Sequence, residues 1–188
     1  TRQILGKEFV GIVTKRAVGH SAAITYSPTK VRAMLKAGAV EAVRKEGDKA
    51  LADFTQRFDG VDLEPSQFEV TPAEADAAMK TVEPRIIQIL KRAYENIHSF
   101  HSKHLRESWE ETHEDGTVLG QRITPIESAG VYVPGGKAFY PSSVLMNIAP
   151  ARVAGVKEII MVSPPSYKGG IHPVVLAAAK IAGATRIF

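Results

Sequence analysis

Apolar side chains recur at the period of an α-helix through the first part of the chain. Ser27–Pro28 is typical of a helix start, and the apolar stripe over 31–43 predicts a helix that ends near Gly47. A second helical stretch is predicted over 50–58, followed by a turn at Asp59–Gly60. This part of the chain is therefore expected to be mainly helical.

Two more helices are predicted before the pattern changes. Thr71 and Glu74 have the spacing of a capping box, and the helix that they begin is expected to run to about Val82. Pro84 then opens the longest helix, in which apolar residues follow the 3.6-residue period. Its end is expected between residues 105 and 109.

The rest of the chain alternates short, continuous apolar runs with short helical stretches. Such runs, separated by helices, imply a parallel sheet that is covered on both faces. We therefore predict an α/β fold, an incomplete Rossmann-like parallel sheet (β-α-β-α-β) preceded by a mainly helical N-terminal region. The predicted order is a strand at 130–133, a helix capped by Ser142 or Ser143 and closed by Gly155, a strand at 158–163, a helix at 174–182 closed by Gly183, and a strand that begins at 185.

Composition narrows the class of protein. The 188 residues include no cysteine, which excludes a disulfide framework, a cysteine-ligated zinc site and a cysteine nucleophile. No apolar run reaches the roughly 20 residues that span a bilayer, and residues 1–18 hold no continuous apolar stretch typical of a signal peptide. We expect a cytoplasmic protein that has no membrane partner.

Charge divides the chain near residue 118. Residues 119–188 carry seven basic and two acidic side chains, which leaves 17 basic and 18 acidic ones in residues 1–118. We interpret residues 1–118 as a mainly helical region and residues 119–188 as the first part of a Rossmann-like NAD-binding domain, truncated at its third strand. The net charge of +4 is too modest to argue for a nucleic-acid partner.

Three histidines of the longest predicted helix form a candidate metal site. His98, His101 and His104 lie three residues apart, so all three are close to one face. However, positions at this spacing drift around the helix, and no Asp or Glu interleaves with them. We therefore favour an ordinary helix surface, on which one or two histidines pack against their neighbours, and consider a metal site the less favoured interpretation.

The loop after the first predicted strand is the best candidate for ligand binding. In open parallel sheets, ligands bind beyond the carboxyl ends of the strands. Gly135 and Gly136 would allow close approach of a ligand to the backbone, and Lys137 would offer charge to a phosphate. A plain Pro-Gly-Gly turn explains the loop equally well. Tyr132, just before it, fits either a strand aromatic or a ligand contact.

Taken together, these segments resemble a known family. The runs 130–136 (GVYVPGG) and 141–147 (PSSVLMN) resemble the signature of histidinol dehydrogenase. The resemblance extends in order from about residue 27 to residue 188, with Phe139 and Tyr140 as minor departures. Other matching segments are 47–51, 57–61, 100–101, 107–109, 118–122, 150–156 and 163–165.

The resemblance implies an NAD-dependent, zinc-requiring, four-electron oxidation of L-histidinol to L-histidine via histidinal, in histidine biosynthesis. It also implies a homodimer, and it makes Tyr132 the only family cofactor-binding residue in this chain. The family's zinc ligands, its catalytic Glu–His pair and its other NAD contacts would follow residue 188. We therefore expect no catalytic or metal-binding residue within residues 1–188, and no activity from this stretch alone.

Two alternatives to this reading stay open. One is a paralogous zinc- and NAD-dependent dehydrogenase that acts on another small alcohol, such as a sulfonated propanediol. The other is a folding or association module without turnover of its own.

Overall fold

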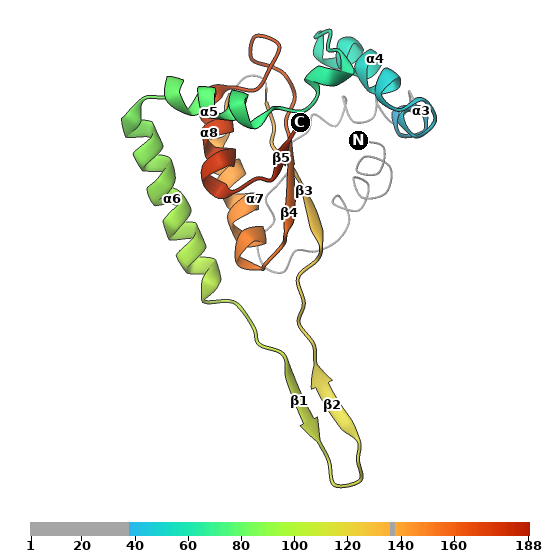
Figure 1. The fold of residues 1–188 in the computed structure, drawn as a ribbon, viewed down its shortest axis with the longest axis vertical. Coiled ribbons are helices and arrows are strands. Elements are labelled where there is room, and N and C mark those ends of the chain that lie inside the picture. Colours follow the sequence, from blue (N-terminus) through green and yellow to red (C-terminus); the bar gives the residue numbers. More distant parts are fainter. Residues whose placement is uncertain (1–37, 136–137) are drawn as a thin grey trace.

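The first described elements are short helices. The computed structural model describes residues 38–135 and 138–188 (Figure 1). Helices α3 (Ala39–Glu46) and α4 (Asp48–Asp59) meet at Gly47, whose φ of 65° ends α3 as predicted. Gly60, with a φ of 71°, ends α4 at the predicted turn, and a 3₁₀ turn, η1 (Pro65–Gln67), follows. The helix start predicted at Ser27–Pro28 lies outside the described residues.

The next two helices, α5 (Pro72–Thr81) and α6 (Pro84–Ser102), begin where they were predicted. The Thr71 hydroxyl accepts a hydrogen bond from the Glu74 N–H at 3.2 Å, and the Glu74 carboxylate accepts one from the Thr71 N–H at 2.7 Å, which confirms the capping box. The predicted end of α6 is wrong by at least three residues. The helix ends in a turn of 3₁₀ type, in which the His104 N–H donates to the His101 carbonyl, three residues earlier, at 2.9 Å.

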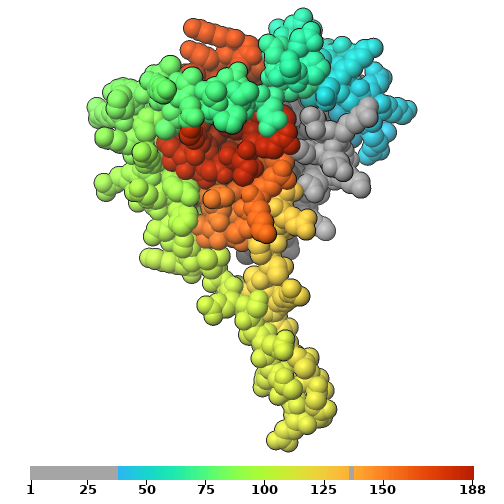
Figure 2. Space-filling model, in the orientation of Figure 1, coloured from blue at the N-terminus to red at the C-terminus, as the bar shows by residue number. Residues whose placement is uncertain are grey.

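A β-hairpin that the sequence pattern did not predict follows α6. Strands β1 (Trp109–Thr112) and β2 (Val118–Gln121) pair antiparallel, with Trp109 opposite Gln121 and Thr112 opposite Val118. Every residue of both strands is exposed, so the hydrophobic alternation that marks a half-buried strand is absent. The hairpin projects from the body as a narrow stalk (Figures 1 and 2).

The main sheet is parallel, which confirms the predicted α/β fold. Strands β3 (Ser128–Tyr132), β4 (Glu158–Val162) and β5 (Arg186–Ile187) lie in that order, with α7 (Pro141–Val153) and α8 (Pro173–Ala182) as the crossovers. Ser142 and Ser143, predicted as caps, lie inside α7. Tyr140 is the N-cap residue instead, and Pro141 occupies the first turn, where its fixed φ starts a helix without a side-chain cap.

The core lies between the sheet and its helices. Leu145 and Ile148 of α7, Met161 of β4 and Ala178 of α8 are all buried, and α5 and α6 pack outside α7 and α8 (Figure 1). Ile160 points to the opposite face of β4 and is also buried. None of the described helices is both long and apolar enough to cross a bilayer.

Candidate cofactor-binding edge

The three parallel strands end together at one edge of the sheet. Beyond the named strands, the Val133 N–H donates to the Val162 carbonyl and the Ser163 N–H to the Phe188 carbonyl, each at 2.9 Å. The loop after β3, described at 134–135 and 138–140, and the loop at 163–172 therefore begin side by side at this edge. This carboxyl edge is the position at which open parallel sheets bind ligands.

Tyr132 is the last residue of β3 and lies at this edge. Its neighbours Val131 and Val133 are buried in the core against α7 and α8. Since side chains alternate along a strand, Tyr132 points to the other face of the sheet, where it is half-buried. The strand geometry thus places the partly accessible phenol of Tyr132 at the carboxyl edge of the sheet.

The Pro-Gly-Gly loop is shaped by its neighbouring loop. A Cβ added to Gly135 would lie 2.5 Å from the Ser166 Oγ and 3.1 Å from the Pro164 Cγ. The absence of a side chain at Gly135 therefore lets two loops of this chain come close together. Of the other residues singled out in this loop, Gly136 and Lys137 lie outside the described residues.

Three rings form an aromatic cluster, Phe139, Tyr167 and His172, between the same two loops. The Phe139 ring is stacked on the His172 ring with centroids 3.6 Å apart, and Tyr167 meets His172 edge-on at 4.5 Å. The His172 Nδ1 accepts a hydrogen bond from the Val174 N–H at 3.2 Å and so caps α8. Burial lowers the pKa of His172 and so favours the neutral imidazole, which is the form that can accept that bond.

Sequence reasoning missed this aromatic cluster because Phe139 lies 28 and 33 positions before Tyr167 and His172 and belongs to a different loop. Phe139 and Tyr167 are brought together only when α7 and β4 place their loops at one edge. The one signal in the sequence was Phe139 itself, a large aromatic residue within the glycine-containing loop.

The basic side chain of β5 is already paired. The Arg186 guanidinium donates to both carboxylate oxygens of Glu69, at 2.8 and 2.6 Å. These hydrogen bonds lower the pKa of Glu69, and its carboxylate in turn holds the guanidinium. The adjoining Val70 N–H donates to the Ile187 carbonyl at 2.9 Å, so this segment also covers the outer side of β5.

The histidines of α6 make local contacts along their own helix. The His98 Nδ1 lies 3.3 Å from the Ser102 Oγ, and the His104 Nδ1 lies 2.9 Å from the Phe100 carbonyl oxygen. Across 38–135 and 138–188, no three His, Asp or Glu side chains come together as metal ligands. The described residues therefore offer no donor set that fits a zinc ion.

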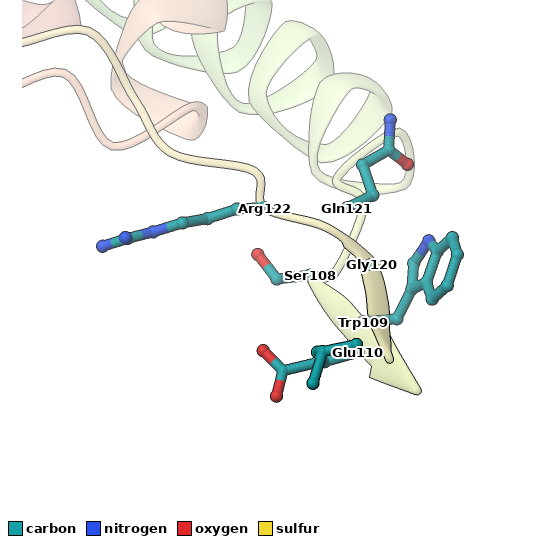
Figure 3. Close-up of a pocket in the computed structure, with 7 residues that line it drawn as sticks. Ser108, Trp109, Glu110, Gly120, Gln121 and Arg122 are labelled. Carbon is teal, nitrogen blue, oxygen red and sulfur yellow. The ribbon is translucent and has the colours of Figure 1, made fainter. Parts of the chain in front are cut away.

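A cavity of about 350 Å³ lies on the hairpin (Figure 3), which projects away from the body that holds the main sheet (Figure 1). The Ser108 hydroxyl beside it both donates to the Ile123 carbonyl and accepts from the Ile123 N–H, so it fastens the base of the hairpin. No cluster of nucleophile and base accompanies it among the lining residues. They are Ser108, Trp109, Glu110, Val118, Gly120, Gln121 and Arg122.

Comparison with known proteins decides the family. A model of the histidinol dehydrogenase family matches residues 27–188. This chain belongs to the histidinol dehydrogenase family. The match includes Tyr132, Gly135 and both loops of the carboxyl edge.

Individual relatives agree with this membership. The chain is 48% identical over 149 residues to histidinol dehydrogenase from Heliobacterium mobile, which covers 79% of this chain and 35% of the relative. It is 50% identical over 149 residues to the Syntrophotalea carbinolica protein of the same name, which covers 79% of this chain and 34% of that one.

A solved structure shares the fold. The crystal structure of histidinol dehydrogenase from Elizabethkingia anophelis superposes with a TM-score of 0.74 at 31% identity, covering 92% of this chain and 38% of that one. The chain thus spans about a third of the length of the relatives that it matches, and it corresponds to their N-terminal part.

Proposed function

We propose that this chain contributes the N-terminal part of an enzyme that oxidises L-histidinol to L-histidine via histidinal, with NAD as the electron acceptor. The proposal is supported by membership of the family over residues 27–188 and by relatives that carry the name histidinol dehydrogenase. On this proposal the protein works in histidine biosynthesis, as a cytoplasmic homodimer whose small-molecule substrate is L-histidinol.

Tyr132 carries the proposed link to NAD. Strand β3 ends at this residue, its side chain is half-buried at the carboxyl edge, and dinucleotides bind at such edges. The phenol has a ring that can stack on a planar group and a hydroxyl that can donate a hydrogen bond. Residues 119–188 would accordingly be the first part of the NAD-binding domain, and residues 1–118 the helical region beside it.

Zinc enters the proposal only through the family. When bound, zinc would position the substrate alcohol as a Lewis acid. The described residues supply no ligand set for it, so no step is assigned to it in this chain. The proposed metal ligands and the Glu–His pair that moves protons belong to the part of the family beyond residue 188. The 188-residue chain alone is therefore expected to be inactive.

The test of this proposal compares turnover by the 188-residue chain with turnover by the full-length protein. NADH formation is measured with zinc, NAD and L-histidinol, first for the 188-residue chain and then for a full-length protein that contains it. The expected result is no NADH from the former and steady formation from the latter. NADH formation by the 188-residue chain, or a full-length protein that oxidises a sulfonated propanediol and not histidinol, would refute the proposal.

Two variants test the role of Tyr132 in the full-length protein. Tyr132→Ala removes the ring and should raise the KM for NAD roughly tenfold or more while the KM for histidinol changes little, as expected for loss of one stacked contact. Tyr132→Phe keeps the ring and is the matched control for the hydroxyl. An unchanged KM for NAD in both variants would remove Tyr132 from the cofactor site.

A further inference from the structure

The hairpin of β1 and β2 exposes several large apolar side chains to solvent. Trp109 is 55% exposed, Leu119 is 54% exposed and Val118 is 53% exposed. An isolated two-stranded hairpin is only marginally stable in water, and uncovered strand edges are templates for pairing with another chain. These features indicate that another surface covers the hairpin.

One face of the hairpin carries its largest apolar side chains. In the observed register, Trp109 lies opposite Gln121 and Leu119 lies opposite Glu111, so these four residues share a face. Trp109 and Leu119 are diagonal neighbours on it, which is within reach of an aromatic ring. Figure 3 shows Trp109 on one side of the hairpin, with Glu110 and Arg122 on the other.

The hydrogen-bond pattern shows which backbone groups face outward. The His113 N–H donates to the Thr117 carbonyl at 2.8 Å, so these two residues form a hydrogen-bonded pair. Hydrogen-bonded and non-hydrogen-bonded pairs alternate along an antiparallel ladder, which makes Thr112–Val118 and Glu110–Gly120 non-hydrogen-bonded pairs. The N–H and C=O groups of Val118 and Gly120 therefore point away from β1, along the free edge of β2.

We propose that β2 pairs edge to edge with β2 of a second copy of this chain, antiparallel about a twofold axis at Leu119. Val118 of each copy would then face Gly120 of the other in two hydrogen-bonded pairs, each of which exchanges two N–H···O=C bonds. Leu119 would face its own counterpart in a non-hydrogen-bonded pair, where side chains lie closest. The result is a four-stranded sheet with Trp109 and Leu119 of both copies on one face.

The distribution of charged side chains favours β2, and not β1, as the strand that pairs with a second copy. β2 consists of Val118, Leu119, Gly120 and Gln121 and has no charged side chain. The corresponding twofold pairing of β1 would set Glu111 against its own counterpart, and like charges directly opposite each other are destabilising. The proposed register also brings Arg122 of each copy beside the acidic turn of the other, which carries Glu114 and Asp115.

The inference names a surface for the homodimer proposed above, and in that respect it rests on the proposed function. Its test needs neither substrate nor cofactor, so its outcome is separate from that of the reaction. A dimer that ignores changes in β2 would refute the surface and leave the homodimer standing.

The first test blocks one strand edge at a time in the 188-residue chain. Val118→Pro removes an outward N–H from β2, and Thr112→Pro, its matched control, removes an outward N–H from β1 directly opposite. Sedimentation velocity over a concentration series should show a monomer–dimer equilibrium for the unchanged chain. Val118→Pro removes one bond from each hydrogen-bonded pair and should raise the dimer dissociation constant roughly 10- to 100-fold, with little effect of Thr112→Pro.

Trp109 gives a second readout, because it is the only tryptophan in the chain. Its fluorescence should become less accessible to a soluble quencher as the concentration rises, and Val118→Pro should abolish that change. A chain that stays monomeric with a fully accessible Trp109 at all concentrations would overturn the proposal. Equal weakening by both proline variants would also overturn it.

A charge-pair test guards against a proline variant that disrupts the hairpin itself. Leu119→Lys and Leu119→Asp each place like charges together at the twofold axis and should separately be monomeric. An equimolar mixture of the two should restore the dimer, because unlike charges then face each other. If the two folded variants fail to associate when they are mixed, the register at Leu119 is wrong.

Discussion

Gly135 offers the sharpest test of how the carboxyl edge is built. In Gly135→Ala, the new Cβ would lie 2.5 Å from the Ser166 Oγ, 3.1 Å from the Pro164 Cγ and 3.3 Å from the Pro164 carbonyl oxygen. The serine hydroxyl can turn away by changing rotamer, whereas the proline ring and its carbonyl can yield only if the backbone moves. The substitution should therefore push the loops after β3 and β4 apart.

The expected size follows from overpacking. Forcing a methyl group into a closely packed contact costs about 1–3 kcal/mol. For a chain of this length, each kcal/mol corresponds to about 2–4 °C in Tm, so Gly135→Ala should lower the Tm by roughly 2–12 °C. Ser166→Gly removes the closest atom and should recover part of this loss when it is combined with Gly135→Ala.

Gly170→Ala is the matched control for Gly135→Ala. It lies in the same pair of loops, but its added Cβ would meet nothing closer than the Tyr167 carbonyl oxygen at 3.9 Å. This variant should be neutral or up to about 1 kcal/mol more stable, because alanine restricts the unfolded chain. Urea unfolding of the four variants measures the free energies. If Gly135→Ala is as stable as Gly170→Ala, the proposed loop-to-loop contact is wrong.

Two further predictions concern the elements that surround the sheet. Glu69→Gln should cost about 0.5–1 kcal/mol, since the Arg186 pair is partly exposed and screened by solvent. The folded-state pKa of Glu69 is lowered, so its contribution is present above the ordinary pKa of a glutamate and is lost as the pH falls through the lowered value. Urea unfolding should thus show the two proteins converging in acid; a constant difference would contradict the ion pair. Thr71→Ala removes the hydroxyl of the capping box and should cost about 1 kcal/mol, measured as a lower urea midpoint; no change would mean that α5 does not depend on this cap.

Short sequence motifs correctly predicted the secondary-structure elements that they belong to. The Thr71 capping box, the glycines at 47, 60 and 183, and the apolar runs of β3 and β4 each act within a few residues of themselves, and each predicted an element that the structure contains. The predicted parallel sheet followed from the order of these elements, because apolar strands separated by helices can bury their surface in few other ways. Tyr132 was located at the edge by the same reasoning.

Other features depend on residues that are distant in sequence. Nothing local indicates that Arg186 pairs with Glu69, 117 positions away, or that Gly135 must be small because of Ser166. The hairpin escaped prediction because neither of its faces is buried, so no alternation marks its strands. The position of the aromatic cluster likewise became visible only once two loops met.

The sequence by itself determined most of the helices, the strands of the main sheet, their parallel order and the family, since these follow from local propensity, periodicity and short motifs. Tertiary structure alone decided which loops touch, which charges pair and which strand edge stays open. The physical reason is that loop contacts and ion pairs form between distant segments that packing of the core brings together, whereas the open edge depends on the register in which the hairpin strands pair. The free edge of β2 is the clearest case: its residues are unremarkable in the sequence, and only the hydrogen-bond register of the hairpin turns them outward.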